Sequence, residues 1–260
     1  PDSVMVVFPD LPQGDDPQDD TINNFIHLST VSDYLNPALI YDSIADIDGN
    51  IYATIKIGSQ TWMAENLKTT KYNDGAGIPY VIDNNVWVTL RTGAYRWYDN
   101  NSYYYKNLYG ALYNWYTVKT GKLCPTGWHV PSDEDWIKLE MTLGMTEEQA
   151  NSWGELPGID GRGTDQGIQM KTVNGWKQWE GQGSGGTNTS GFSALPAGES
   201  AWGGVWPSSV YTYYYGKGIC TTWWESTSEG GGRAIDCVNP GIGRGVFPAF
   251  CGLSIRCVKN

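Results

Sequence analysis

This chain of 260 residues is poor in charge and in histidine. Only 17% of its residues are charged, His27 and His129 are its only histidines, and none of its five cysteines stands in a C-x-x-C pair. Structural zinc sites use clustered Cys and His ligands, so a zinc site is not expected. No apolar run approaches the length of a membrane span, and no signal peptide is recognisable. The first residue is Pro1 rather than Met, which is typical of a processed or trimmed chain.

The net charge is strongly negative. A formal charge of −11 argues against nucleic acid and anionic membranes as partners, because both carry the same sign of charge.

Aromatic residues with polar tips are abundant instead. The chain has 13 Trp and 17 Tyr against 5 Phe, together with 33 Gly and 13 Pro. Trp and Tyr suit half-buried loops and binding faces, since one end of each side chain is apolar and the other polar. The many Gly and Pro favour a turn-rich α+β or β fold over a helical one.

Residue patterns predict strands at both ends of the chain and helices between them. Alternating apolar residues predict a hairpin over 51–64. Apolar spacing predicts a helix around 108–116, and capping-box patterns at Ser132 and Thr146 predict helices ending near 144 and 154. Further strands are expected at 221–227, 233–238 and 251–258. This order is typical of an α+β domain with two to three helices, a small antiparallel sheet and long loops.

The first 45 residues read as a separate segment. Residues 9–20 have the Pro- and Asp-rich composition of a linker or exposed arm, and residues 4–8 could be an added strand or the remnant of a preceding domain. The main domain is expected over 46–260. Its first residues, Asp46 to Asn50, resemble the start of a calcium loop, but Ile57 stands where the bidentate Glu is needed, so a turn is predicted.

The five cysteines favour disulfides in an exported protein. Cys124 and Cys257 are the expected pair, because they lie in a helix-start segment and a final strand that together would close one domain. Cys237–Cys251 is a second predicted bridge, which leaves Cys220 over, although sequence does not fix the connectivity of these three.

Six segments, in order, carry a family resemblance. They are Gly49–Tyr52 with Ile57–Leu67, Tyr109–Trp115, Cys124–Ser132, Gly191–Gly198, Trp223–Thr227 and Gly252–Val258. Together they resemble the Fibrobacter succinogenes major paralogous domain over about 46–260. The helix start and the final strand are also similar to the C-type-lectin-like and formylglycine-generating-enzyme-like superfamily. The resemblance implies a C-type-lectin-like domain in a Bacteroidetes surface protein, either outer-membrane-anchored or on a pilus tip.

Two site classes of that superfamily are not expected here. The lectin tripeptides that bind calcium are absent, and Trp224-Glu225-Ser226 stands in place of Trp-Asn-Asp, so calcium is possible elsewhere but not indicated. A modifying enzyme would use reactive cysteines such as Cys251 and Cys257, yet no catalytic partners surround them. His129 is interpreted as a packed or hydrogen-bonded residue. The prediction is therefore no enzyme, no metal and no cofactor.

The candidate ligand site is an aromatic loop region over 196–220. Sugar rings stack on Trp and Tyr, and a nearby carboxylate can accept hydroxyl hydrogen bonds. The predicted ligand-binding residues are Trp202, Trp206, Tyr211, Tyr213, Tyr214 and Glu199, with Tyr215 and Ser208 nearby. The alternative is that these rings pack the loop onto the sheet. Trp62, Trp115, Trp128, Trp136 and Trp223 are expected in the core.

The sequence thus favours a non-enzymatic adhesion or ligand-binding module of the cell surface. Its expected partner is a glycan or a host or neighbouring protein. The alternatives are a structural fimbrial or surface-assembly subunit that contacts other pilus subunits through 1–45 and, more distantly, a modifying enzyme of the formylglycine-generating type.

Overall fold

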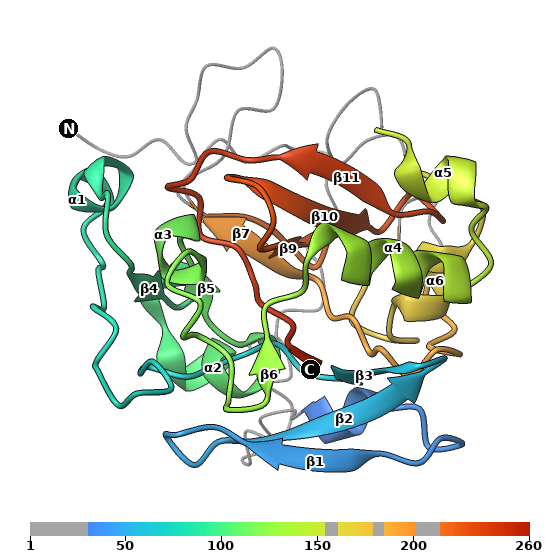
Figure 1. Ribbon diagram of the computed structural model, residues 1–260, viewed down its shortest axis with the longest axis horizontal. Coiled ribbons are helices and arrows are strands. Elements are labelled where there is room, and N and C mark those ends of the chain that lie inside the picture. Colours follow the sequence, from blue (N-terminus) through green and yellow to red (C-terminus); the bar gives the residue numbers. More distant parts are fainter. Residues whose placement is uncertain (1–30, 154–160, 179–184, 201–213) are drawn as a thin grey trace.

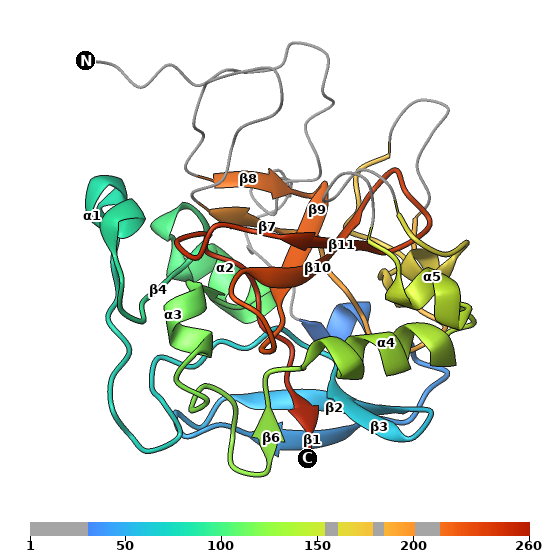
Figure 2. The same ribbon diagram turned by 45° about the horizontal axis from the view of Figure 1, so that its top comes forward.

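Two five-stranded sheets frame the molecule. The computed structural model describes residues 31–153, 161–178, 185–200 and 214–260. Figures 1 and 2 show one sheet around β1–β3 and the other around β7–β11, with α4 beside both and α2 and α3 on the opposite side. The C-terminal segment runs from the second sheet to the first (Figure 1).

The strands and helices of the described residues have the following bounds. The first sheet is wholly antiparallel, in the order β1 (Asp42–Ala45), β2 (Ile51–Ile57), β3 (Gln60–Met63), β12 (Val258–Lys259) and β6 (Trp128–His129). The second has the order β11 (Gly243–Val246), β10 (Gly231–Asp236), β9 (Cys220–Trp224), β7 (Ala197–Ser200) and β8 (Tyr214–Lys217). A two-stranded sheet pairs β4 (Tyr95–Arg96) with β5 (Leu112–Tyr113). The helices are α1 (Asn84–Thr89), α2 (Ser102–Tyr109), α3 (Trp115–Val118), α4 (Asp133–Thr142), α5 (Glu147–Asn151) and α6 (Gln166–Met170), with 3₁₀ turns η1 (Val31–Tyr34) and η2 (Tyr98–Asn100).

The mixed α+β class and several local predictions are confirmed. The hairpin predicted over 51–64 is β2–β3, and it turns at Gly58, which has a φ of 59°. Both predicted capping boxes are present: Ser132 pairs with Asp135 at the start of α4, and Thr146 pairs with Gln149 at the start of α5. These features depend on residues close together in sequence, which is why the pattern alone revealed them.

The helix predicted around 108–116 is wrong. Helix α2 ends at Tyr109, strand β5 follows, and the separate short helix α3 begins at Trp115. Gly110 has a φ of 76°, and a Cβ there would lie 2.8 Å from the Leu67 carbonyl oxygen. A helix cannot continue through a left-handed residue pressed against another backbone.

The sheet content also differs from the prediction of one small antiparallel sheet. Among the described residues, ten strands lie in two five-stranded sheets, and the second sheet contains a parallel pair, β7 with β9. Six α-helices occur in the described residues instead of two to three, and four of them have fewer than seven residues. Such short elements carry too little periodicity to be recognised in sequence.

The domain begins before residue 46. Strand β1 pairs with β2 through Asp42–Thr54 to Ala45–Ile51, so it belongs to the first sheet. Leu39 and Tyr41 pack against the core. Residues 31–45 are therefore part of the domain rather than of an exposed arm, and residues 1–30 lie outside the described residues.

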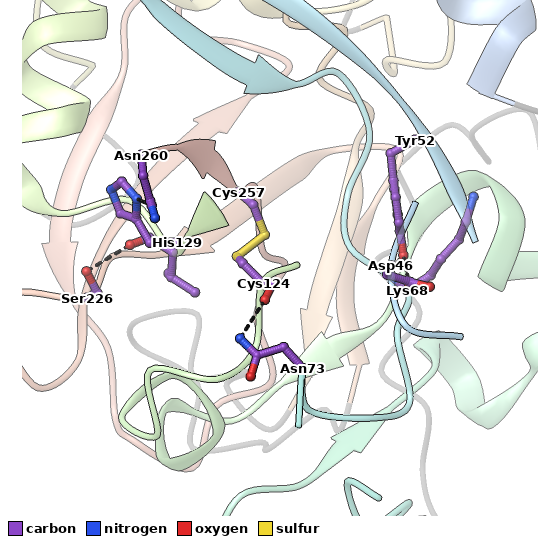
Figure 3. The surroundings of a disulfide bond; sticks show 10 residues. Asp46, Tyr52, Lys68, Asn73, Cys124, His129, Ser226, Cys257 and Asn260 are labelled. Atoms are coloured by element: carbon purple, nitrogen blue, oxygen red, sulfur yellow. Dashed lines mark hydrogen bonds between the residues drawn. A yellow bond between two sulfur atoms is a disulfide. The ribbon is translucent and has the colours of Figure 1, made fainter. Parts of the chain in front are cut away.

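A disulfide joins Cys124 to Cys257, as predicted. The bond links residues 133 positions apart, with 6.0 Å between the two Cα atoms. Figure 3 shows it beside Asn73, whose side-chain Nδ2 donates to the Cys124 carbonyl at 3.1 Å. The bond ties the segment before β6 to the segment before β12.

The predicted Cys237–Cys251 bridge is wrong. All five cysteines lie in the described residues, and Cys220, Cys237 and Cys251 are free thiols. Cys237 packs in the hydrophobic cluster around Trp136, whereas Cys251 packs in the cluster around Trp224. The two thiols thus belong to different parts of the core.

Aromatic rings fill the centre between the sheets. The ring of Trp136 lies 5.0 Å from that of Trp62 and 5.8 Å from that of Trp223, with Phe192 against both Trp62 and Trp136. The core placement predicted for Trp62, Trp115, Trp136 and Trp223 is confirmed by burial, and Trp128 is half-buried. Burial of these large rings provides much of the hydrophobic stabilisation.

Arg256 is the most deeply embedded charge of the C-terminal segment. Its Nε donates to Asn66 Oδ1 at 2.7 Å, and its terminal nitrogens donate to the carbonyl oxygens of Met63, Phe192 and Ser193. The guanidinium also lies 4.5 Å from the centre of the Phe192 ring. Burial lowers the pKa of Arg256 to about 9, so the group remains charged at neutral pH.

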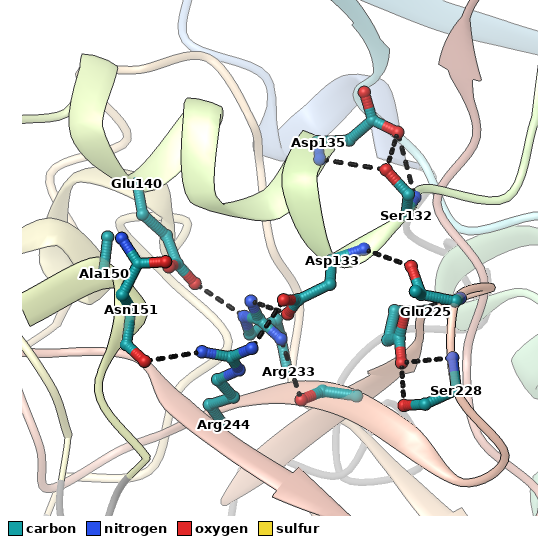
Figure 4. Close-up of polar contacts among 12 residues, drawn as sticks. Ser132, Asp133, Asp135, Glu140, Ala150, Asn151, Glu225, Ser228, Arg233 and Arg244 are labelled. Carbon is teal, nitrogen blue, oxygen red and sulfur yellow. Dashed lines mark hydrogen bonds and ion pairs between the residues drawn. The ribbon is translucent and has the colours of Figure 1, made fainter. Parts of the chain in front are cut away.

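A buried ion network fixes α4 to the second sheet (Figure 4). Glu140 of α4 accepts from Arg162 and from Arg233 of β10, at 2.7 Å each. Asp133, at the start of α4, accepts from Arg233 at 2.7 Å and from Arg244 of β11. Because each partner would be left as an unpaired buried charge if another moved, the network specifies one position for the helix.

Replacing both bonded cysteines by serine should lower stability substantially. The bond closes a loop of 133 residues, and removing such a constraint from the unfolded chain costs about 3–5 kcal/mol. Urea unfolding of Cys124→Ser/Cys257→Ser against the unchanged protein measures this loss. Thiol titration in denaturant should find three reactive thiols before reduction and five after it; one thiol before reduction would contradict the assignment.

Arg256→Met should destabilise the fold by about 3–5 kcal/mol, because it leaves several buried carbonyl oxygens without a donor. Arg256→Lys keeps the charge but cannot reach all these acceptors, and should lose about 1–3 kcal/mol. Urea unfolding compares the two. Equal stability of Arg256→Met and the unchanged protein would show that the hydrogen bonds contribute nothing.

Candidate functional site

The predicted aromatic loop is described only at its two ends. Strand β7 leads into it and β8 follows it, so Glu199 and Tyr214 are described. The predicted residues Trp202, Trp206, Tyr211 and Tyr213 lie outside the described residues, as does Ser208.

Glu199 faces the interior. Its side chain accepts a hydrogen bond from Thr222 Oγ1 at 3.0 Å, and only 6% of the residue is exposed. Burial raises the pKa of Glu199 to about 7, while the bond from Thr222 acts in the opposite direction. In this position the carboxyl group helps join β7 to β9 rather than offering an oxygen to solvent.

Two free thiols, the buried Cys251 and the half-buried Cys220, lie near enough to this carboxyl group to be affected by its charge. Burial, with a contribution from the Glu199 charge, raises the pKa of both Cys220 and Cys251. A raised pKa suppresses the reactive thiolate form. Cys257 is already disulfide-bonded, so the Cys251–Cys257 pair considered from sequence is not present as two thiols.

Tyr214 takes part in a chain of ring contacts that joins two tyrosine runs of the sequence. Its ring lies 5.2 Å from that of Tyr98, which lies 5.5 Å from that of Tyr105. Along α2, the rings of Tyr105 and Tyr104 are 6.3 Å apart and those of Tyr104 and Tyr103 are 4.9 Å apart. The structure therefore brings residues 103–105 together with the run that ends at Tyr215.

We define the tyrosine surface as the outer rings of this group, Tyr103, Tyr104 and Tyr214, together with Tyr80, whose ring stacks on Tyr95 beside η2. Tyr103 is 62% exposed and Tyr80 is 45% exposed, while Tyr104 and Tyr214 are half-buried. The Tyr80 hydroxyl donates to the Asn100 carbonyl at 3.2 Å, which holds it beside η2. Figure 2 shows α2 near β7 and β8. Exposed rings supported by buried ones suit the binding of a flat apolar ligand face.

An unusual backbone turn positions the tyrosine surface. Asp99 and Asn100 have φ values of 50° and 53°, a left-handed conformation that residues with a Cβ seldom adopt. Asn101 follows, and its side chain accepts from the backbone N–H groups of Tyr103 and Tyr104 to cap α2. Such conformations cluster at functional sites, where the surrounding structure maintains them.

Arg96 supports the tyrosine surface from the interior of the protein. The side chain is fully buried, and its guanidinium lies 4.3 Å from the Trp87 ring centre and 5.3 Å from that of Tyr214. Within the part of the chain that the structure describes, its hydrogen bonds go to uncharged acceptors: the Val81 and Ile82 carbonyls and Asn84 Oδ1. A cation held between two rings stabilises both of them.

The remaining polar candidates are engaged in local structure. Glu225, in the segment that replaces the lectin Trp-Asn-Asp, accepts from the backbone of Thr227 and Ser228. His129 contacts Asn260 Oδ1 at 2.6 Å and Asp135 Oδ2 at 2.9 Å, which confirms its interpretation as a hydrogen-bonded residue. Across the described ranges, no group of three His, Cys, Asp or Glu side chains is arranged to hold a metal ion.

Sequence reasoning missed most of the tyrosine surface. Tyr80, Tyr103 and Tyr104 were not among the predicted site residues, although the run Tyr103-Tyr104-Tyr105 matches Tyr213-Tyr214-Tyr215 in composition. The presence of two tyrosine triplets could have been noticed in the sequence. Their proximity in space could not be predicted, because Tyr105 and Tyr214 are 109 positions apart.

Comparison with known proteins places the chain in a family. Residues 55–259 match the Fibrobacter succinogenes major domain. The chain belongs to this family. No curated protein and no solved structure matches it.

This membership confirms the family resemblance predicted from the sequence segments. The match spans α1–α6, the whole second sheet and, in the first sheet, the strands from Ile55 of β2 onward, whereas β1 precedes it. The Cys124–Cys257 disulfide is typical of exported proteins of an oxidising compartment. Among the described helices, none is long and apolar enough to cross a membrane.

Glu199→Gln should remove a pH-dependent loss of stability. Between pH 4.5 and about 7 the unfolded carboxyl group releases its proton while the folded one keeps it, so stability falls as pH rises through this window. Gln can still accept from Thr222 but does not titrate. Urea unfolding at pH 5 and pH 8 should show a loss larger by about 1–3 kcal/mol in the unchanged protein than in the variant. Identical pH dependence would mean that Glu199 is ionised at neutral pH.

Proposed function

We propose that this chain is a non-enzymatic binding module of the cell surface that recognises a glycan through its tyrosine surface. The main observation in favour of this proposal is that the Tyr80 and Tyr103 rings are exposed, while buried rings and a left-handed turn lie beneath them. Exposed rings on rigid elements give stacking area at low entropic cost. A host or neighbouring protein is the other ligand class that such a surface fits.

The aromatic segment after β7 is proposed as a continuation of the same site. Trp202, Trp206, Tyr211 and Tyr213 precede Tyr214 in sequence, and Tyr214 itself belongs to the tyrosine surface. Glu199 is buried, which argues for a supporting role instead of direct hydroxyl binding.

The finer fold assignment also belongs to this proposal. We propose a C-type-lectin-like arrangement, supported by the pairing of the early strand β3 with the final strand β12 and by the disulfide that ties the segment before β12 to the segment before β6. The family membership and the disulfide support a surface location on a bacterium, such as a pilus tip.

One observation favours a structural subunit as a second candidate. Strand β1 is the outer strand of its sheet, and Ile40 just before it is 94% exposed. An open strand edge beside an exposed apolar side chain can pair with another chain. In that case β1 and the residues before it would make assembly contacts with other pilus or surface subunits.

A glycan array screened with single-residue variants tests the binding function. Tyr103→Ala removes the most exposed ring of the surface, and it should weaken binding at least about fivefold because one stacking contact is lost. Trp202→Ala and Trp206→Ala test the proposed continuation of the site in the same way.

Ile51→Ala provides the matched control. Ile51 is 66% exposed on β2, in the other sheet, and its loss should leave binding unchanged. Absence of binding to any glycan, together with co-purification of surface subunits that is lost when the exposed Ile40 is replaced in Ile40→Lys, would support the structural subunit instead.

A further inference from the structure

The outward face of α2 places a cation next to its exposed ring. Tyr103 and Lys106 are three positions apart on this helix, so their side chains lie on the same face, about 5–6 Å apart at Cβ. Tyr103 is 62% exposed and Lys106 is half-exposed. The Lys106 ammonium lies 5.8 Å from the centre of the Trp97 ring and, within the described residues, forms no ion pair.

The charge around the tyrosine surface differs in sign from that of the whole chain. Residues 80–109 and 214–217 contain four cations, Arg91, Arg96, Lys106 and Lys217, against two carboxylates, Asp83 and Asp99. Arg96 contributes a buried positive charge whose hydrogen-bond acceptors among the described residues are uncharged, with the Asp83 carboxylate near enough to act on it through space. In a chain of net charge −11, the two segments that carry the tyrosine surface thus have a positive net charge.

We propose that this face binds a saccharide that carries a carboxylate, such as a uronate, with the sugar ring on Tyr103 and the carboxylate at Lys106. This inference rests on the proposed glycan-binding function and specifies its ligand class. In a uronate the carboxylate is attached directly to the ring, so a sugar stacked on Tyr103 would hold its carboxylate within reach of a long side chain one helical turn away, such as Lys106. The negative net charge of the protein disfavours the binding of anions in general. An anionic ligand is therefore expected to bind only near local cations such as Lys106.

Oligogalacturonate and its methyl ester are the matched probes, because they share the same ring and differ in charge. By calorimetry at low salt, the acid should bind about threefold to tenfold more tightly than the ester. Lys106→Gln should bring this ratio close to one without weakening binding of the ester. Tyr103→Ala should weaken both, and Lys106→Arg should restore the preference for the acid.

Lys119→Gln is the control for this series. Lys119 also lies over a tryptophan ring, 5.6 Å from the centre of Trp115, but it follows α3 rather than lying on α2. Its replacement should change neither affinity. Thermal unfolding of each variant establishes that the loss in Lys106→Gln is not a loss of folding.

Three outcomes would overturn the inference. Equal affinity for acid and ester, with both lost in Tyr103→Ala, would leave glycan binding intact and refute the preference for a carboxylate. Binding of polyglutamate as tight as that of oligogalacturonate would show a general anion or peptide site. Array binding that is absent for every glycan would refute the proposed function itself.

Discussion

The packing of the C-terminal segment around Arg256 is the constraint on which the rest of the structure depends. This segment crosses from one sheet to the other, and Arg256 contacts backbone carbonyls from the β3 end and from the loop before β7 at once. A buried guanidinium tolerates few arrangements, since each donor needs an acceptor. The adjacent Cys257 is bonded to Cys124, so the charge and the covalent bond hold the same stretch of chain in place.

Helix α4 is positioned by the same kind of constraint. Its predicted capping box fixes where the helix begins, but the ion pairs of Asp133 and Glu140 with Arg233 determine where it lies against the second sheet. Burial of Trp136 stabilises the contact between α4 and the sheet but is non-directional. The paired charges restrict the position and orientation of the helix. The second sheet in turn supports the segments between β4 and α2, since Ala197 of β7 packs in one hydrophobic cluster with Tyr98 and Tyr105.

The proposed binding site depends on this packing. Stacking on an aromatic ring favours binding only when the ring loses little entropy on complex formation, and the inner rings of Tyr98 and Tyr105 hold the outer ones in position. The turn at Asp99 and Asn100 adopts an unfavourable conformation that the packed scaffold maintains. Lys106 then adds charge to a surface whose shape is already set, which is why ring contact and charge can be tested separately.

The family, the α+β class, the β2–β3 hairpin, both capping boxes and the Cys124–Cys257 bond could all be predicted from the sequence. These features depend on residues that are close in sequence or on family-specific segments. Three other features became known from the folded chain alone: Gly110 ends α2, Cys237 and Cys251 pack apart, and Tyr105 is linked to Tyr214 through Tyr98. Local patterns report which face of an element is apolar, whereas contacts between distant segments depend on how those faces pack together.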